Sequence, residues 1–207
     1  MILLLAAAYA EIPPPDYHRE LANAAADQAA VFAQAGSVAQ MEAAEEFAKR
    51  WRRTLGSRDA QGSAQLAYEL GLGWRLAGDA ERAEGALDDA ITADPTLVAA
   101  LYDRGEVKLQ RGDLDGALAD FTEVVKHAPE TWPAHFRLAD IAARRGDVVV
   151  FERELTEALR YGFSFRDVAQ DPAWRTIFLD PKLGLVMQRL ITVYQGDDVL
   201  GLFGGPP

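Results

Sequence analysis

The side chains that most often carry chemistry are few in this chain of 207 residues, and their spacing predicts no catalytic centre. The three histidines are His18, His127 and His135. None has a convincing partner three or four residues away, the spacing that places two metal ligands on one helix face. The chain has no cysteine, which excludes disulfides, thiolate nucleophiles and cysteine-ligated zinc. We therefore expect no enzyme activity, no cofactor and no metal.

Acidic residues are abundant, but their spacing points to solvated surfaces. Neighbours such as Asp88 and Asp89 diverge by about 100° around a helix, so they do not converge on one substrate. No glycine-rich phosphate loop and no Gly-x-Ser-x-Gly elbow is present. The net charge is −11, with the acidic excess concentrated in residues 61–130, which opposes binding to nucleic acid. A solubilising surface and a docking surface for a basic partner stay open as alternatives.

The most informative pattern is a Gly-Asp step that recurs every 34 residues, at Gly78, Gly112 and Gly146. Pro95 and Pro129 repeat at the same interval. This is the length of a repeat made of two helices joined by a turn. Glycine ends the first helix of each pair at low conformational cost, the following aspartate caps the second helix, and proline stops it. The pattern predicts antiparallel helix pairs at about 64–77 and 80–93, 96–111 and 114–127, and 131–145 and 148–161.

The flanks of this array are less regular. An apolar run ends in Ala8-Tyr9-Ala10, which indicates either a cleaved export signal or an apolar segment that packs on the domain. No segment is long enough to cross a membrane. At the other end the tail is expected to be loose, or to dock through Leu200, Leu202 and Phe203. The expected divisions are 1–10 as a signal peptide, 11–62 as N-terminal helices at about 16–35 and 38–55, 63–161 as three repeats (63–96, 97–130, 131–163), 164–195 as a helical cap and 196–207 as a flexible tail.

The repeats resemble the tetratricopeptide repeat, a family with a Trp-x2-Leu-Gly-x2-Tyr, Ala-x3-Phe, Ala and Pro pattern. The resemblance implies an all-α fold, a right-handed α-solenoid of about three helix pairs with an N-terminal helical hairpin and a C-terminal helical cap. The third repeat departs from the pattern, because Phe151 replaces a small residue and Phe163 replaces the proline, so its helix pair is expected to be splayed. The slots are filled by Ala67, Leu70, Gly71, Trp74, Ala83, Leu87, Ala90 and Pro95, then by Leu101, Arg104, Gly105, Lys108, Ala117, Phe121, Val124 and Pro129, then by His135, Leu138, Ala139, Ala142, Phe151, Leu155 and Ala158.

In this family, ligands usually lie in a concave groove lined by the first helix of each pair. Tyr68, Tyr102 and Phe136 recur there at the 34-residue step, and aromatic and arginine side chains often dominate binding energy at interfaces. The alternative is that these rings fill gaps between stacked helices. The residues expected to contact a partner are Tyr68, Leu72, Arg75, Tyr102, Asp103, Glu106, Phe136, Arg137, Asp140 and Arg144.

The resemblance implies a non-enzymatic adaptor or scaffold that binds a protein or peptide segment, alone or as a component of a larger assembly. A family subset that grips acidic C-terminal tails needs Lys and Asn on these helices, and only Arg137 matches, so we expect no such clamp. If the N-terminal signal is real, the protein is expected in the periplasm or envelope of a bacterium. The alternative is a cytoplasmic chaperone of secreted or assembled proteins.

Overall fold

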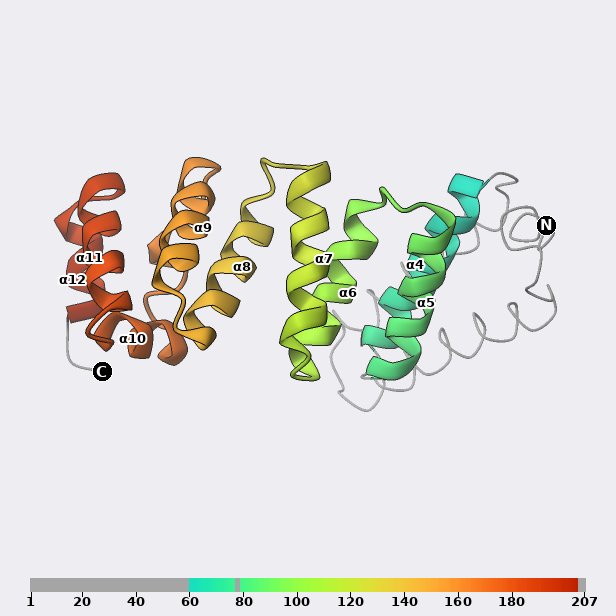
Figure 1. Ribbon diagram of the computed structural model, residues 1–207, viewed down its shortest axis with the longest axis horizontal. Coiled ribbons are helices and arrows are strands. Elements are labelled where there is room, and N and C mark those ends of the chain that lie inside the picture. The colour runs from blue at the N-terminus through green and yellow to red at the C-terminus, as the bar shows by residue number, and fades with distance from the viewer. Residues whose placement is uncertain (1–59, 77–78, 205–207) are drawn as a thin grey trace, which may run out of the picture. The chain divides into compact units, whose positions relative to one another are not determined.

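The computed structural model describes residues 60–76 and 79–204, and within these ranges the chain is helical and has no strand (Figure 1). The expected signal peptide at 1–10 and the helices expected at 16–35 and 38–55 lie outside the described residues. The helices are α4 (Ala60–Leu76), α5 (Ala80–Ala93), α6 (Val98–Gln110), α7 (Leu114–His127), α8 (Trp132–Arg145), α9 (Val148–Arg160), the short 3-10 helix η2 (Phe165–Asp167), α10 (Pro172–Leu179), α11 (Leu183–Tyr194) and α12 (Asp197–Gly204).

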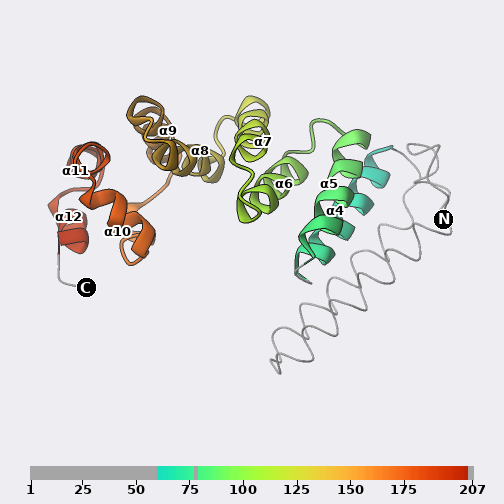
Figure 2. The same ribbon diagram turned by 60° about the horizontal axis from the view of Figure 1, so that its bottom comes forward.

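The expected all-α class, built from successive packed helix pairs, is confirmed. The chain divides into two compact units, residues 1–120 and 121–207, which we describe separately. In the first unit α4 packs along α5, and α6 packs against both (Figure 2). In the second unit α8 packs along α9, and α11 packs against α9, α10 and α12. The first pair differs from the expectation at its start, because α4 begins at Ala60, four residues before Ala64.

The Gly-Asp steps end and begin helices as their chemistry predicts. Gly112 and Gly146 have φ angles of 81° and 69°, the left-handed region that favours glycine. The carboxylate of Asp79 accepts a hydrogen bond from the Arg82 backbone N–H, and Asp147 accepts one from Val150 in the same way. The triple-valine run 148–150 is therefore the first turn of α9, because a capped helix start outweighs the β propensity of three branched residues.

The core of the first unit joins α4, α5 and α6. Trp74, Leu87 and Val107 are buried in one cluster, and Ala83 and Ala90 let the helices approach. The guanidinium of Arg82 lies 3.5 Å above the indole of Trp74, so the outer edge of this core is closed by a cation–π contact. The remaining buried members are Ala67, Leu70, Ala86 and Ala100.

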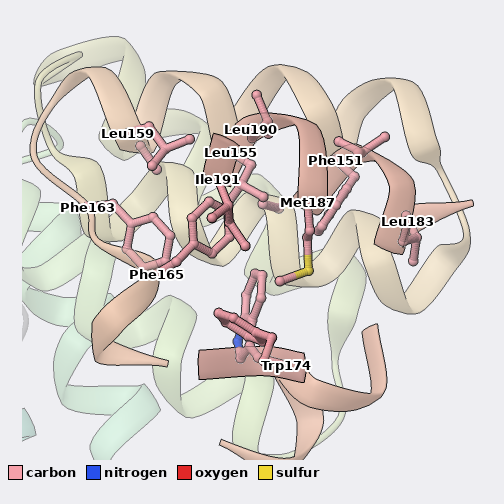
Figure 3. Packing of buried hydrophobic residues seen from close by; sticks show 14 of the residues in the cluster. Phe151, Leu155, Leu159, Phe163, Phe165, Trp174, Leu183, Met187, Leu190 and Ile191 are labelled. Carbon is pink, nitrogen blue, oxygen red and sulfur yellow. The ribbon is translucent and has the colours of Figure 1, made fainter. Parts of the chain in front are cut away.

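The second unit has a larger, aromatic core (Figure 3). In Figure 3 Met187 of α11 points towards Trp174 of α10. Phe151 of α9 stacks on Trp174 with ring centroids 6.3 Å apart, and it is fully buried. The large ring in a slot that usually holds a small residue is therefore surrounded by side chains of α10 and α11. Phe163, in the slot of the missing proline, follows the left-handed Gly162 and is buried beside Phe165.

The C-terminal tail, for which a loose segment and docking through Leu200, Leu202 and Phe203 were both open, packs as a helix in the second unit. Residues 197–204 form α12, which starts after the left-handed Gly196 and carries Asp197 and Asp198 in its first turn, where the helix dipole favours negative charge. Val199 and Phe203 are buried, and the ring of Phe203 stacks on Phe178 at 5.0 Å. The apolar pair at four-residue spacing holds α12 on the second unit.

Candidate partner-binding face

The residues expected to bind a partner lie on α4, α6 and α8, which we call the A helices. In the first unit, Tyr68, Leu72, Arg75, Tyr102 and Glu106 are half-buried, whereas Asp103 is buried. In the second unit, Phe136 and Arg137 are half-buried, Arg144 is exposed and Asp140 is buried. The two buried aspartates therefore act on neighbouring side chains, and the half-buried residues are the ones whose atoms reach the surface.

Three of the expected residues form one polar network between α4 and α6. The Tyr68 hydroxyl donates a hydrogen bond of 2.9 Å to Asp103 Oδ2, and Arg75 Nη2 lies 3.4 Å from Asp103 Oδ1. Burial, the charge of Asp103 and the hydrogen bond to it together raise the pKa of Tyr68 well above its usual value of 10. The phenol is therefore a neutral donor at physiological pH, and its ring spans the gap between α4 and α6.

Phe136 is brought together with aromatic side chains from the end of the chain. Its ring stacks on Trp174 of α10 with centroids 4.6 Å apart and lies 4.8 Å from the ring of Phe163. The Phe136 ring therefore contributes to the packing of the second unit. A partner could contact only the part of this side chain that stays exposed. Trp132, also half-buried, meets Phe136 edge-on at 6.5 Å.

The charged residues of α8 pair along the helix. Arg144 Nη2 lies 2.9 Å from Asp140 Oδ2, one helical turn earlier. The guanidinium of Arg137 lies 5.8 Å from the centre of the Phe136 ring. Arg144 is therefore held near the end of α8 in a defined orientation, with half of its side chain exposed.

Two buried ion networks were not anticipated from the sequence. Arg104 of α6 bonds Asp120 of α7 through Nε and Nη2, at 3.0 and 2.5 Å, and reaches Asp88 of α5 at 2.6 Å. Lys108 adds a second cation, 2.9 Å from Asp120. Burial lowers the pKa of Arg104, but the hydrogen bonds to both aspartates and their negative charges together outweigh burial and raise this pKa. The sequence does hint at both networks, because Glu154 lies 34 residues after Asp120 and so occupies the same position in the next repeat.

That second acid, Glu154 of α9, pairs with His135 of α8 at 2.8 Å. Partner spacing within a single helix does not predict this pair, because Glu154 is 19 residues from His135 in the sequence. The bond depends on two helices of a pair lying side by side, which single-helix spacing cannot reveal. Within the described ranges no three His, Cys, Asp or Glu residues gather in a way that could hold a metal ion. None of the described helices is both long and apolar enough to cross a membrane.

Comparison with known families identifies the helix pairs. Residues 102–164, from the first turns of α6 to just beyond the end of α9, match the family model described as tetratricopeptide repeat. Residues 102–164 therefore belong to the tetratricopeptide repeat family. The matched segment contains the second Gly-Asp step, Gly112-Asp113, and the third, Gly146-Asp147, with the glycine and aspartate roles described above. The tetratricopeptide family is typically a module for protein interaction, and this supports an adaptor role.

One curated relative matches part of this chain. It is the tetratricopeptide repeat and J domain-containing co-chaperone DNJ1 of Cryptococcus neoformans, 34% identical over 83 residues. The match covers 40% of this chain and only 16% of the relative. The similarity therefore concerns a segment the size of a few helices, and the J domain and co-chaperone activity in its name belong to that protein.

Proposed function

We propose that this protein is a non-enzymatic adaptor or scaffold that binds a segment of another protein through surface residues of its A helices. The family match over α6 to α9 is the observation that carries the proposal. Leu72 and Tyr102 on these helices are half-buried and combine apolar area with polar neighbours. Half-buried aromatic side chains are well suited to an interface, because they bury much area at a small cost in conformational entropy.

A chaperone role is the second candidate, and the partial similarity to a co-chaperone favours it. In that case the face of the A helices would hold a client or another chaperone. The two candidates differ in location as well as in partner. We propose the bacterial periplasm or envelope for the adaptor, on the basis of the Ala8-Tyr9-Ala10 pattern, and the cytoplasm for the chaperone.

Affinity capture of the full chain from its own cells tests partner binding. The variant Leu72→Glu with Tyr102→Ala should lose specific partners, because it removes apolar area and adds a charge on the A-helix face. Val149→Ala is the control, since Val149 is exposed and belongs to α9, which is not an A helix. Circular dichroism must show equal helix content for both variants. If the double variant keeps every partner that the control keeps, the proposed face is wrong.

Location is tested by fractionation and N-terminal sequencing of the native protein. A chain that begins at Glu11 in the envelope fraction supports the adaptor in the periplasm. An intact Met1 in the cytosol contradicts export and favours the chaperone.

A further inference from the structure

The imidazole of His135 connects three parts of the second unit. Nδ1 lies 2.8 Å from Glu154 Oε2 on α9, and Nε2 lies 2.9 Å from the carbonyl oxygen of Pro129, in the turn between α7 and α8. The ring stacks on Tyr161 at the end of α9, with centroids 5.9 Å apart. Only 7% of the residue is exposed, so water cannot readily replace a lost partner.

Both ring nitrogens face hydrogen-bond acceptors. A carbonyl oxygen and a carboxylate oxygen can only accept, whereas a neutral imidazole has a single N–H to donate. Either neutral tautomer would therefore place a nitrogen lone pair less than 3 Å from an oxygen lone pair. The imidazolium alone donates to both partners, so the geometry is that of the charged form.

The charged groups around the ring favour this form. Glu154 and Glu157 face it from α9, and Arg153 binds Glu154 Oε1 at 2.8 Å on the side away from the imidazole. Burial lowers the pKa of His135, but the bonds to Glu154 and Pro129 and the two negative charges outweigh burial and raise it above 6.5. Burial likewise raises the pKa of Glu154, yet the bonds from His135 and Arg153 hold it below its usual 4.5.

We propose that His135 is a pH-sensitive clamp, which as imidazolium ties the α7–α8 turn to α9 and on losing its proton releases the Pro129 carbonyl. The carboxylate bond survives in preference, because hydrogen bonds to charged groups are roughly twice as strong as neutral ones. The released segment is the turn of residues 128–131. The bonds that remain there include those from the Ala128 N–H to the Val124 carbonyl at 2.8 Å, from the Thr131 N–H to the Ala128 carbonyl at 3.1 Å and from the Trp132 N–H to the Glu130 carbonyl at 2.9 Å. This turn leads directly into α8, and α8 carries Phe136 and Arg137.

The direction of the pH dependence follows from the raised pKa. A histidine whose pKa is higher in the folded chain than in the unfolded chain stabilises the fold fully below about 6.5. The stabilisation is lost as the pH rises through the folded-state value. The clamp is therefore closed below the folded-state pKa of His135, which lies above 6.5, and opens as the pH rises through that pKa.

Nuclear magnetic resonance of the full chain tests the clamp. We expect the ring nitrogens of His135 to titrate together above pH 6.5, with both N–H groups present below the transition. Over the same transition the protection factor of the Thr131 amide, corrected for intrinsic exchange, should fall several-fold. Glu154→Gln should move the transition to lower pH, and His127→Gln, at the exposed end of α7, should leave it unchanged.

His135→Leu provides a second test, in which the imidazole and its bonds to Glu154 and Pro129 are removed but the space is still filled. Leu101 fills the corresponding slot 34 residues earlier and is buried, so leucine suits this position by size. In this variant the protection of Thr131 should not vary with pH. A single N–H on the His135 ring below pH 6.5, or an unchanged Thr131 protection factor while His135 titrates in the wild-type chain, would overturn the proposal.

Discussion

Gly71 of α4 lies directly against Leu87 of α5, so close that a Cβ on Gly71 would stand 2.7 Å from Leu87 Cγ. Leu87 is fully buried, and the backbone carbonyl oxygen of Ala83, one turn earlier on α5, would lie 3.4 Å from the same Cβ. Neither neighbour can move away cheaply. The distance between the first two helices therefore depends on the absence of one methyl group.

Gly71→Ala should destabilise the first unit for this reason. Alanine is the better helix former by about 1 kcal/mol, but overpacking a tight core costs about 1–3 kcal/mol, so we expect a net loss of about 1 kcal/mol. Urea unfolding followed by circular dichroism measures it. Gly85→Ala is the matched control, because a Cβ there meets nothing within 4 Å. The control should gain stability, and a gain in both variants would mean that the close approach is unimportant.

Tyr68→Phe should destabilise the contact between α4 and α6. It removes the hydroxyl that donates to Asp103 and leaves that buried carboxylate with Arg75 at 3.4 Å. We expect a loss of about 1–2 kcal/mol, the range for a hydrogen bond to a charged group that keeps one partner. Tyr194→Phe on the exposed face of α11 serves as the control and should change stability little. Equal losses in the two variants would show that the bond to Asp103 contributes nothing specific.

The ionisation of Tyr68 gives a prediction for alkaline pH. Its pKa is raised by burial, then by the charge of Asp103 and the bond to it, so the phenol should ionise above pH 10. Because the folded-state pKa is the higher one, the stabilisation is complete below about pH 10 and is lost as the pH rises through the folded value. Asp103→Asn should lower the pKa of Tyr68, as measured from tyrosinate absorbance against Tyr68→Phe. No change on removing the carboxylate would contradict the assigned cause.

Asp147→Ala should weaken the start of α9. The carboxylate accepts the Val150 N–H at 3.0 Å, and loss of such a cap costs about 0.5–2 kcal/mol. Asp147→Asn keeps an acceptor and should recover most of the loss, which separates the hydrogen bond from the charge. If asparagine is as poor as alanine, the negative charge at the helix end matters more than the bond.

Phe203→Ala should destabilise the second unit by about 3 kcal/mol, the lower end of the cost of truncating a buried phenylalanine. The ring packs on Phe178 and edge-on against Phe165, so its loss leaves a cavity under α12. Leu185→Ala is the control, since Leu185 on α11 is 65% exposed and its truncation should cost little. A tail that does not dock in solution would give equally small effects for both variants, measured by chemical unfolding.

The sequence predicted best those features that depend on neighbouring residues. The left-handed Gly146 and the capping Asp147 act on residues within four positions, and the 34-residue step fixed their place. The Gly146-Asp147 step also correctly predicted a helix at 148–161, although three consecutive valines at its start favour a strand. Helix ends were therefore predictable to within a few residues.

Features that depend on contact between distant residues were not predictable. The bonds from Tyr68 to Asp103 and from His135 to Glu154 span 35 and 19 residues, and each depends on the rotation of two helices. The helical period of α12 is obscured in the sequence by Gly201 and Gly204, although Val199 and Phe203 at four-residue spacing indicate an apolar face. Binding by the A-helix face stays a prediction.

Two of the four tryptophans, Trp74 and Trp174, are buried one in each unit, so each can report on its own unit once the other indoles are replaced. Trp74 in the first unit is 1% exposed and lies beneath the cation of Arg82, while Trp174 in the second is 3% exposed among phenylalanines. Their emission spectra should therefore differ before unfolding and shift to the red independently when either surrounding melts. Variants that retain one indole at a time would reveal whether the two halves of this small protein lose their structure in one cooperative event or in two.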